Sequence, residues 1–214
     1  MKVINLFGAP GTGKSATMLG LGNRLKRMGL SAEITPEYFK ELIQEVTPEA
    51  YKEVMRQDSA RMRFGGQLQV LAEQNRRLAM HVNSTDFVVS DCPLPLVAFY
   101  TSKDYIPGFH EMANNLFNKY DNVNYLVVPS PTQRHDFENA NRVHDAQQSA
   151  LIQQNLQQFL AEHRVSYQVV EADDQIEDVI LRNMRASGAL TTKHLQESRN
   201  PEVRRSASLA WGAP

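Results

Sequence analysis

Residues 8–15 read Gly8-Ala9-Pro10-Gly11-Thr12-Gly13-Lys14-Ser15, which fits the pattern G-x-x-x-x-G-K-[ST] of a phosphate-binding loop, or P-loop. The apolar run at residues 3–7 predicts a strand before it, and apolar residues at helical spacing within residues 16–28 predict a helix after it. Such a loop aims backbone N–H groups at phosphate oxygens, and the positive end of the helix dipole adds to the attraction. The sequence therefore predicts a nucleoside triphosphate site, with ATP as the expected ligand.

Each part of this loop has an expected role. Lys14 is expected to reach the β- and γ-phosphates, where it would also act in catalysis, and Ser15 is expected to ligate Mg²⁺. The nucleotide-binding residues are predicted to be Gly8, Ala9, Pro10, Gly11, Thr12, Gly13, Lys14, Ser15 and Ala16. ATP and Mg²⁺ are thus the expected cofactors.

The composition excludes several classes of protein. The 214 residues suit one α/β domain with a core of its own, and a formal net charge of −1 gives no overall basic field for nucleic acid. A single cysteine, Cys92, excludes a disulfide framework. No N-terminal apolar stretch resembles a signal peptide or a membrane span, so we expect a cytoplasmic protein with no membrane partner. A homo-oligomer is compatible with these data.

The chain alternates between strand-like and helical segments. Strand-like runs occur at residues 3–7, 30–34, 87–90, 123–128 and 167–170, with helical patterns between them. This order predicts an α/β, P-loop NTPase fold: a five-stranded parallel sheet with helices on both faces and a helical insertion between strands 2 and 3. We expect one kinase-like domain over residues 1–187, followed by a mobile C-terminal tail over residues 188–214.

An acidic residue is expected next to the P-loop. Asp91 directly follows the third predicted strand and should emerge at its carboxyl end, where open α/β sheets bind ligands. There it would act in catalysis, either by assisting Mg²⁺ or by accepting the proton of an attacking hydroxyl. The alternative is that Asp91 only caps a helix that starts near Pro93.

Residues after the second strand are candidates for acceptor binding. Glu37 and Tyr38 follow this strand, and the pair would bind a sugar hydroxyl or stack on a base. Glu37 is equally suited to be an ordinary first-turn acid of a helix. Gln67 and Gln74 of the long helix in the insertion offer amide groups to a base edge, or are simply solvated helix residues.

A polar segment after the fourth strand is predicted to form a lid over about residues 131–143. Arg134 and Arg142 flank this segment. In a closed lid, a guanidinium would neutralise charge on the transferring phosphoryl group while water is excluded. The alternative is that both arginines pair only with nearby acids such as Glu138.

Together these motifs resemble those of the small P-loop nucleoside and nucleotide kinases, and most closely those of the NadR-like AAA-type ATPase/kinase group that includes ribosylnicotinamide kinases. The resemblance covers about residues 1–172 and includes the P-loop, Pro36-Glu37-Tyr38, the helix with Gln67, Ser90-Asp91-Cys92-Pro93-Leu94 and the predicted lid. Cys92 stands where many such kinases have an arginine. The resemblance implies phosphoryl transfer from ATP to a hydroxyl or phosphate of a nucleoside-like acceptor.

Three functions follow from these patterns. The first is an ATP-dependent kinase of a nucleoside- or nucleotide-like small molecule. The second is a kinase that acts on a hydroxyl of a polynucleotide, at a modified base or an end, which the basic residues of the tail keep open. The third is a non-catalytic ATP-binding protein of regulatory or assembly function.

Overall fold

The computed structural model describes residues 1–44, 66–130 and 146–191. Within them, one sheet of five parallel strands has the order β2-β3-β1-β4-β5. The strands are β1 (Lys2–Phe7), β2 (Ala32–Thr35), β3 (Phe87–Ser90), β4 (Asp121–Pro129) and β5 (Gln168–Ala172). The α/β fold predicted from the sequence is therefore confirmed.

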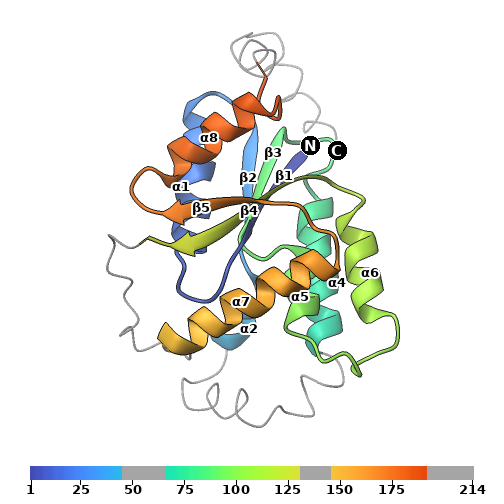
Figure 1. Cartoon of the computed structure of the whole chain (residues 1–214). Coiled ribbons are helices and arrows are strands. Elements are labelled where there is room, and N and C mark those ends of the chain that lie inside the picture. The colour runs from blue at the N-terminus through green and yellow to red at the C-terminus, as the bar shows by residue number, and fades with distance from the viewer. Residues whose placement is uncertain (45–65, 131–145, 192–214) are drawn as a thin grey trace, which may run out of the picture.

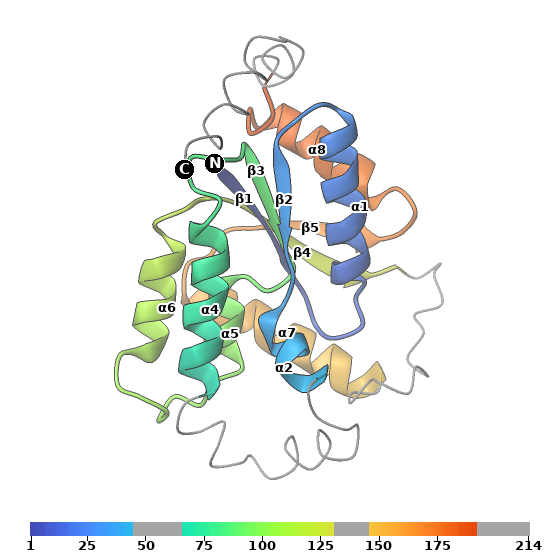
Figure 2. The same cartoon turned by 180° about the vertical axis from the view of Figure 1, so that it is seen from behind.

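Helices cover both faces of the sheet, as predicted. The helices are α1 (Lys14–Arg27), α2 (Tyr38–Gln44), α4 (Gln67–Ala79), α5 (Leu94–Phe99), α6 (Phe109–Phe117), α7 (Ala146–Glu162) and α8 (Ile176–Ala186). Helices α1 and α8 pack on one face, and α4, α5, α6 and α7 pack on the other (Figure 1). The view from behind shows α2 directly after the carboxyl end of β2 (Figure 2).

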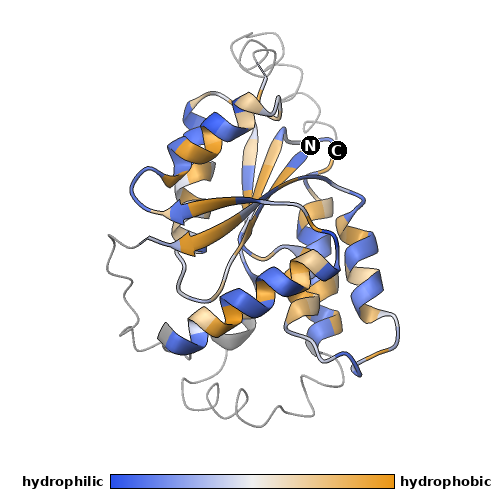
Figure 3. Cartoon of the chain, in the orientation of Figure 1, coloured by the Kyte–Doolittle hydropathy of each residue, from blue (hydrophilic) through white to orange (hydrophobic). Residues whose placement is uncertain are grey.

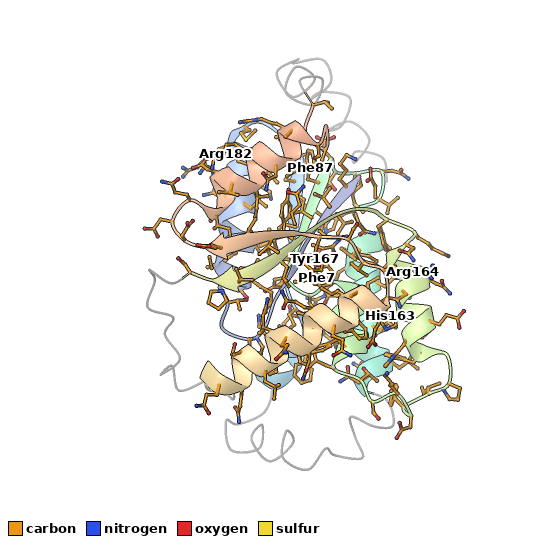
Figure 4. The ribbon with its side chains drawn as sticks, viewed as in Figure 1. Phe7, Phe87, His163, Arg164, Tyr167 and Arg182 are labelled. Atoms are coloured by element: carbon orange, nitrogen blue, oxygen red, sulfur yellow. The ribbon has the colours of Figure 1, made fainter. Side chains whose placement is uncertain are left out.

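The central strand supplies both layers of the core. Ile4 and Leu6 of β1 face α1 and α8, whereas Val3 and Phe7 face the other four helices. A parallel strand buried on both faces reads as a continuous apolar run, which explains why residues 3–7 were recognisable in the sequence. Figure 3 shows the apolar strands between two-toned helices, and Figure 4 shows Phe7 on the α7 side of the sheet.

One buried polar residue interrupts this run. Asn5 is 1% exposed, and its side-chain amide donates hydrogen bonds of 2.9 Å to both Asn122 Oδ1 and Asn124 Oδ1 on β4. A buried amide without partners would destabilise the fold, so these contacts favour the observed register of β1 and β4.

The segments between the strands match the predicted plan in the part of the chain that the structure describes. Helices α2 and α4 belong to the predicted insertion between β2 and β3. Helix α6, between β3 and β4, was not predicted. Ala189 and Leu190 are buried, so the packed chain extends beyond residue 187. The predicted lid and residues 192–214 lie outside the described residues. None of the described helices is both long and apolar enough to span a membrane.

Two leucines of α1 test this packing. Leu21 is fully buried and Leu19 is 56% exposed. Leu21→Ala should lower the free energy of unfolding by about 2–5 kcal/mol, because it removes apolar contacts and leaves a cavity. Leu19→Ala should change it by less than about 0.5 kcal/mol. Urea unfolding followed by circular dichroism measures both, and equal losses would contradict the assigned face of α1.

Candidate active site

The P-loop is a tight turn between the end of β1 and the start of α1. Gly8 has a φ of +151°, and a Cβ on it would lie 2.7 Å from both Thr12 Oγ1 and the carbonyl oxygen of Val127. Gly13, just before α1, has a φ of +85° in the left-handed region. Only glycine adopts both conformations readily, so these residues allow the loop to curl around a phosphate-sized group at the helix N-terminus.

Lys14 points into this loop. Its Nζ atom donates hydrogen bonds of 2.8 Å to the carbonyl oxygens of Gly8 and Ala9. Burial lowers the pKa of Lys14 to about 8, although the nearby carboxylates of Glu37 and Asp91 act in the opposite direction. At neutral pH the ammonium thus remains mainly charged, beside the backbone that would hold the phosphates.

Asp91 lies next to the P-loop, as the sequence suggested. The Ser15 hydroxyl donates a 2.6 Å hydrogen bond to Asp91 Oδ2. Asp91 is 1% exposed, and its second oxygen, Oδ1, is buried with no hydrogen-bond partner among the described residues. Helix α5 begins after Pro93 without a side-chain cap, so Asp91 does not act as the helix cap that was the alternative interpretation.

Lys40 is a site residue that the sequence reasoning missed. Its Nζ atom lies 2.9 Å from Ser15 Oγ, 3.3 Å from Asp91 Oδ2 and 3.1 Å from Glu37 Oε2. Burial alone would lower the pKa of Lys40, but Glu37 and Asp91 outweigh this effect and raise it. The available indication was its position three residues after Glu37, because that spacing places both side chains on one face of a helix.

The residues after β2 are held by the long helix α4. Gln74 is fully buried; its Oε1 accepts a hydrogen bond of 3.1 Å from the Tyr38 amide, and its Nε2 donates one of 3.4 Å to the Pro36 carbonyl. Gln74 therefore fixes the start of α2, and the idea that it reads a base edge is wrong, because both ends of its amide are used internally.

The side chain of Tyr38 is held by two residues of α4, one at its hydroxyl and one over its ring. Its hydroxyl accepts a 3.1 Å hydrogen bond from Gln69 Nε2, and the guanidinium carbon of Arg77 lies 4.9 Å from its ring centre. Gln67 is the first residue of α4, two positions before Gln69. Of the proposed acceptor residues, Gln67 lies on α4, whereas Glu37 and Tyr38 lie in the segment that α4 holds in place.

Helix α7 contacts the P-loop from the other side, which the sequence did not indicate. Ser149 Oγ donates a 2.8 Å hydrogen bond to the Pro10 carbonyl, and Gln153 Oε1 accepts one of 2.7 Å from the Ala9 amide. Ser149 is buried, and Gln153 Nε2 is a buried atom without a hydrogen-bond partner in the parts of the chain that the structure describes. These two side chains hold the first half of the loop against α7.

The donor atoms present fit a Mg·nucleotide. A serine hydroxyl and carboxylate oxygens are hard ligands of the kind that Mg²⁺ prefers, and Asp91 Oδ1 has hydrogen-bonding capacity that no group in the described part of the chain uses. Within residues 1–44, 66–130 and 146–191, no group of three or more His, Cys, Asp or Glu could hold a metal ion. Mg²⁺ at this site would thus take further ligands from phosphate and water.

Three further residues named in the sequence analysis are Cys92, Arg134 and Arg142. Cys92 is buried, and burial raises the pKa of its thiol, so the thiol is neutral and packs in the core. Arg134 and Arg142 lie outside the described residues, together with the lid to which they were assigned.

A family model described as an AAA domain matches residues 3–178. The chain belongs to this AAA-domain family. None of the curated proteins compared with the chain matches it. The match covers the P-loop, the whole sheet and the start of α8, so the family assignment and the observed architecture concern the same part of the chain.

Several solved structures are similar in fold. NadR protein in complex with NR aligns with a TM-score of 0.57 at 20% identity over 87% of this chain, which spans only 52% of the NadR chain. Deoxyadenosine kinase from M. mycoides, with dCMP and dCDP bound, aligns with a TM-score of 0.54 at 15% identity, over 87% of this chain and 100% of that one. Shikimate kinase from Aquifex aeolicus has a TM-score of 0.49 at 12% identity, over 89% and 100%. The alignments with NadR and deoxyadenosine kinase show that the chain shares the fold of these two proteins.

Substitution of two adjacent glutamines, one at a time, tests the contact of α7 with the P-loop. Gln153→Leu removes the acceptor of the Ala9 N–H and should raise the Kd for ATP about fivefold, since one charge-neutral hydrogen bond to a loop amide is worth about 1 kcal/mol. Gln154 is exposed on the same helix, so Gln154→Leu should leave the Kd unchanged. Isothermal titration calorimetry measures both, and equal Kd values in the two variants would show that the contact does not support binding.

Proposed function

We propose that this protein is a P-loop kinase that transfers the γ-phosphoryl group of ATP to a hydroxyl of a nucleoside- or nucleotide-like acceptor. The observation that carries the proposal is the hydrogen bond between Ser15 and Asp91, with Glu37 beside them. It brings a phosphate-binding loop and two carboxylates to the same edge of the sheet. A P-loop kinase can use both, because the reaction transfers a phosphoryl group from a bound triphosphate to a hydroxyl that must lose its proton.

In the proposed reaction the acceptor oxygen forms a bond to the γ-phosphorus while the bond from this phosphorus to the β–γ bridging oxygen breaks. ADP leaves, and the hydroxyl proton passes to a carboxylate. Lys14 stabilises the β- and γ-phosphates through its ammonium group. Mg²⁺, held by Ser15 and Asp91, would neutralise charge on the phosphates. Arg134 and Arg142 are proposed to add positive charge near the transferring group.

The contacts of the two carboxylates suggest a division of roles. Asp91 is bonded to the Ser15 hydroxyl, which favours a role on the metal side. Glu37 makes no hydrogen bond to the Ser15 hydroxyl, and its side chain is 20% exposed beside Lys40. Glu37 is therefore the carboxylate better placed to accept a proton from an incoming hydroxyl, with Tyr38 and Gln67 as further acceptor contacts.

The decisive measurement is ADP release with a panel of acceptors: nucleosides, nucleoside monophosphates, nicotinamide riboside and oligonucleotides. The similarity to NadR and to deoxyadenosine kinase motivates the first three classes. At least one small acceptor should raise the rate well above basal hydrolysis, and Lys14→Ala should abolish this increase in a folded protein. Stimulation by oligonucleotides alone would make the protein a polynucleotide kinase. ATP binding without any stimulation would make it a non-catalytic ATP-binding protein.

A pair of isosteric variants separates the two carboxylates. Asp91→Asn should lower turnover and raise the Mg²⁺ concentration needed for half-maximal rate, because it removes a carboxylate ligand of the metal. Glu37→Gln should lower kcat about 10²- to 10⁴-fold, the value of positioned proton transfer. Its Mg²⁺ requirement should stay that of the wild type.

Steady-state kinetics at stepped Mg²⁺ concentrations, with thermal unfolding as the control for folding, measures these effects. If Asp91→Asn turned over normally and lost only thermal stability, Asp91 would be a structural residue. If Glu37→Gln kept full kcat, another group would accept the proton.

A further inference from the structure

Lys40 places a positive charge among three oxygen atoms from three parts of the fold. They are Ser15 Oγ at the start of α1, Asp91 Oδ2 after β3 and Glu37 Oε2 after β2, all within 3.3 Å of Nζ. About half of the Lys40 side chain is exposed, whereas that of Asp91 is almost fully buried. A buried carboxylate is destabilised unless a positive charge lies beside it. Lys40 therefore stabilises the fold more through Asp91 than it would through an ion pair at the surface.

Ser15 Oγ and the carboxylate group of Asp91 are also the ligands assigned to the metal above. The Ser15 hydroxyl donates to Asp91 Oδ2 and accepts from Lys40, so one of its two lone pairs already faces a cation. A divalent ion that binds Ser15 Oγ would need a lone pair of the same hydroxyl. It would also meet the ammonium at a distance where two cations repel strongly. The two cations thus exclude each other at these oxygens.

We propose that Lys40 is a built-in competitor of the divalent cation. When no metal is bound, its ammonium holds the Ser15 hydroxyl and the Asp91 carboxylate together and compensates the buried charge. When the metal arrives with the nucleotide, it displaces the ammonium, which the flexible four-carbon stem of lysine permits. Lys40 therefore sets the metal concentration at which the site fills. This inference rests on the metal assignment of the proposed function.

The competitor role differs from that of a phosphate-binding lysine. A lysine that binds phosphate strengthens nucleotide binding, so its loss weakens the affinity for ADP at every metal concentration. A lysine that competes with the metal opposes metal binding, so its loss lowers the metal concentration required. The two roles therefore predict shifts of different kinds, and a metal titration separates them.

The experiment measures ADP affinity by isothermal titration calorimetry at stepped free Mg²⁺ concentrations. Lys40→Met should lower the half-saturating Mg²⁺ concentration about tenfold, the factor expected when hydrogen bonds to a charged group no longer compete. Lys40→Arg keeps the charge and should stay near the wild-type value. Lys26→Met is the matched control, because Lys26 is an exposed lysine paired with Glu33 near the far end of α1.

Thermal unfolding without nucleotide gives an independent measurement. Lys40→Met should unfold at a lower temperature than the wild type, because the buried Asp91 charge loses its partner, and Mg²⁺ should stabilise this variant more than the wild type. If Lys40→Met fails to fold, Lys40→Gln keeps a polar group and is expected to shift the Mg²⁺ requirement in the same direction.

An unchanged or higher Mg²⁺ requirement in Lys40→Met would overturn the inference. Asp91→Asn shows which assumption has failed. If Asp91→Asn raises the Mg²⁺ requirement while Lys40→Met leaves it unchanged, the metal assignment stands and the competitor role is wrong. If Asp91→Asn also leaves it unchanged, the metal assignment in the proposed function is wrong as well.

Discussion

The parallel pairing of β1 with β3 is the constraint on which the candidate site depends. Asn5 of β1 is aligned with Ser90 of β3, so the two strands end at the same edge of the sheet. The P-loop leaves one strand and Asp91 leaves the other at that edge, which allows the 2.6 Å hydrogen bond from Ser15 to Asp91. A slip of the pairing by one residue would turn Asp91 to the other face of the sheet.

The electrostatics of the site are close to balanced. Lys14 and Lys40 face Glu37 and Asp91, so two positive and two negative side chains meet within a small volume. Attraction of a triphosphate to this part of the chain therefore relies on directed groups, namely the loop amides, the start of α1 and the Lys14 ammonium. This is consistent with a chain whose formal net charge is only −1.

The sequence predicted the features that have a local pattern. The P-loop has a fixed spacing, the buried strands are continuous apolar runs, and Asp91 follows one of them directly. Because parallel strands end at a common edge, the proximity of Asp91 to the loop could be inferred without coordinates.

Other features depend on distances between separate elements, which no local pattern contains. Gln74 gave no indication that its amide holds the start of α2, because a helical glutamine looks the same in sequence whether it faces solvent or core. The contacts of Lys40 with Ser15 and Asp91 follow from that placement of α2 and were missed for the same reason. Ser149 and Gln153 lie more than a hundred residues after the loop that they contact.

The contacts from α7 have a consequence for sequence variation. Ser149 and Gln153 bind the carbonyl of Pro10 and the amide of Ala9, which are backbone atoms that most residue types share. The side chain at position 10 can therefore vary without loss of its hydrogen bond, whereas positions 149 and 153 need side chains of specific chemistry. Coupled substitutions between the loop and the helix would not reveal this contact, since only one partner uses its side chain.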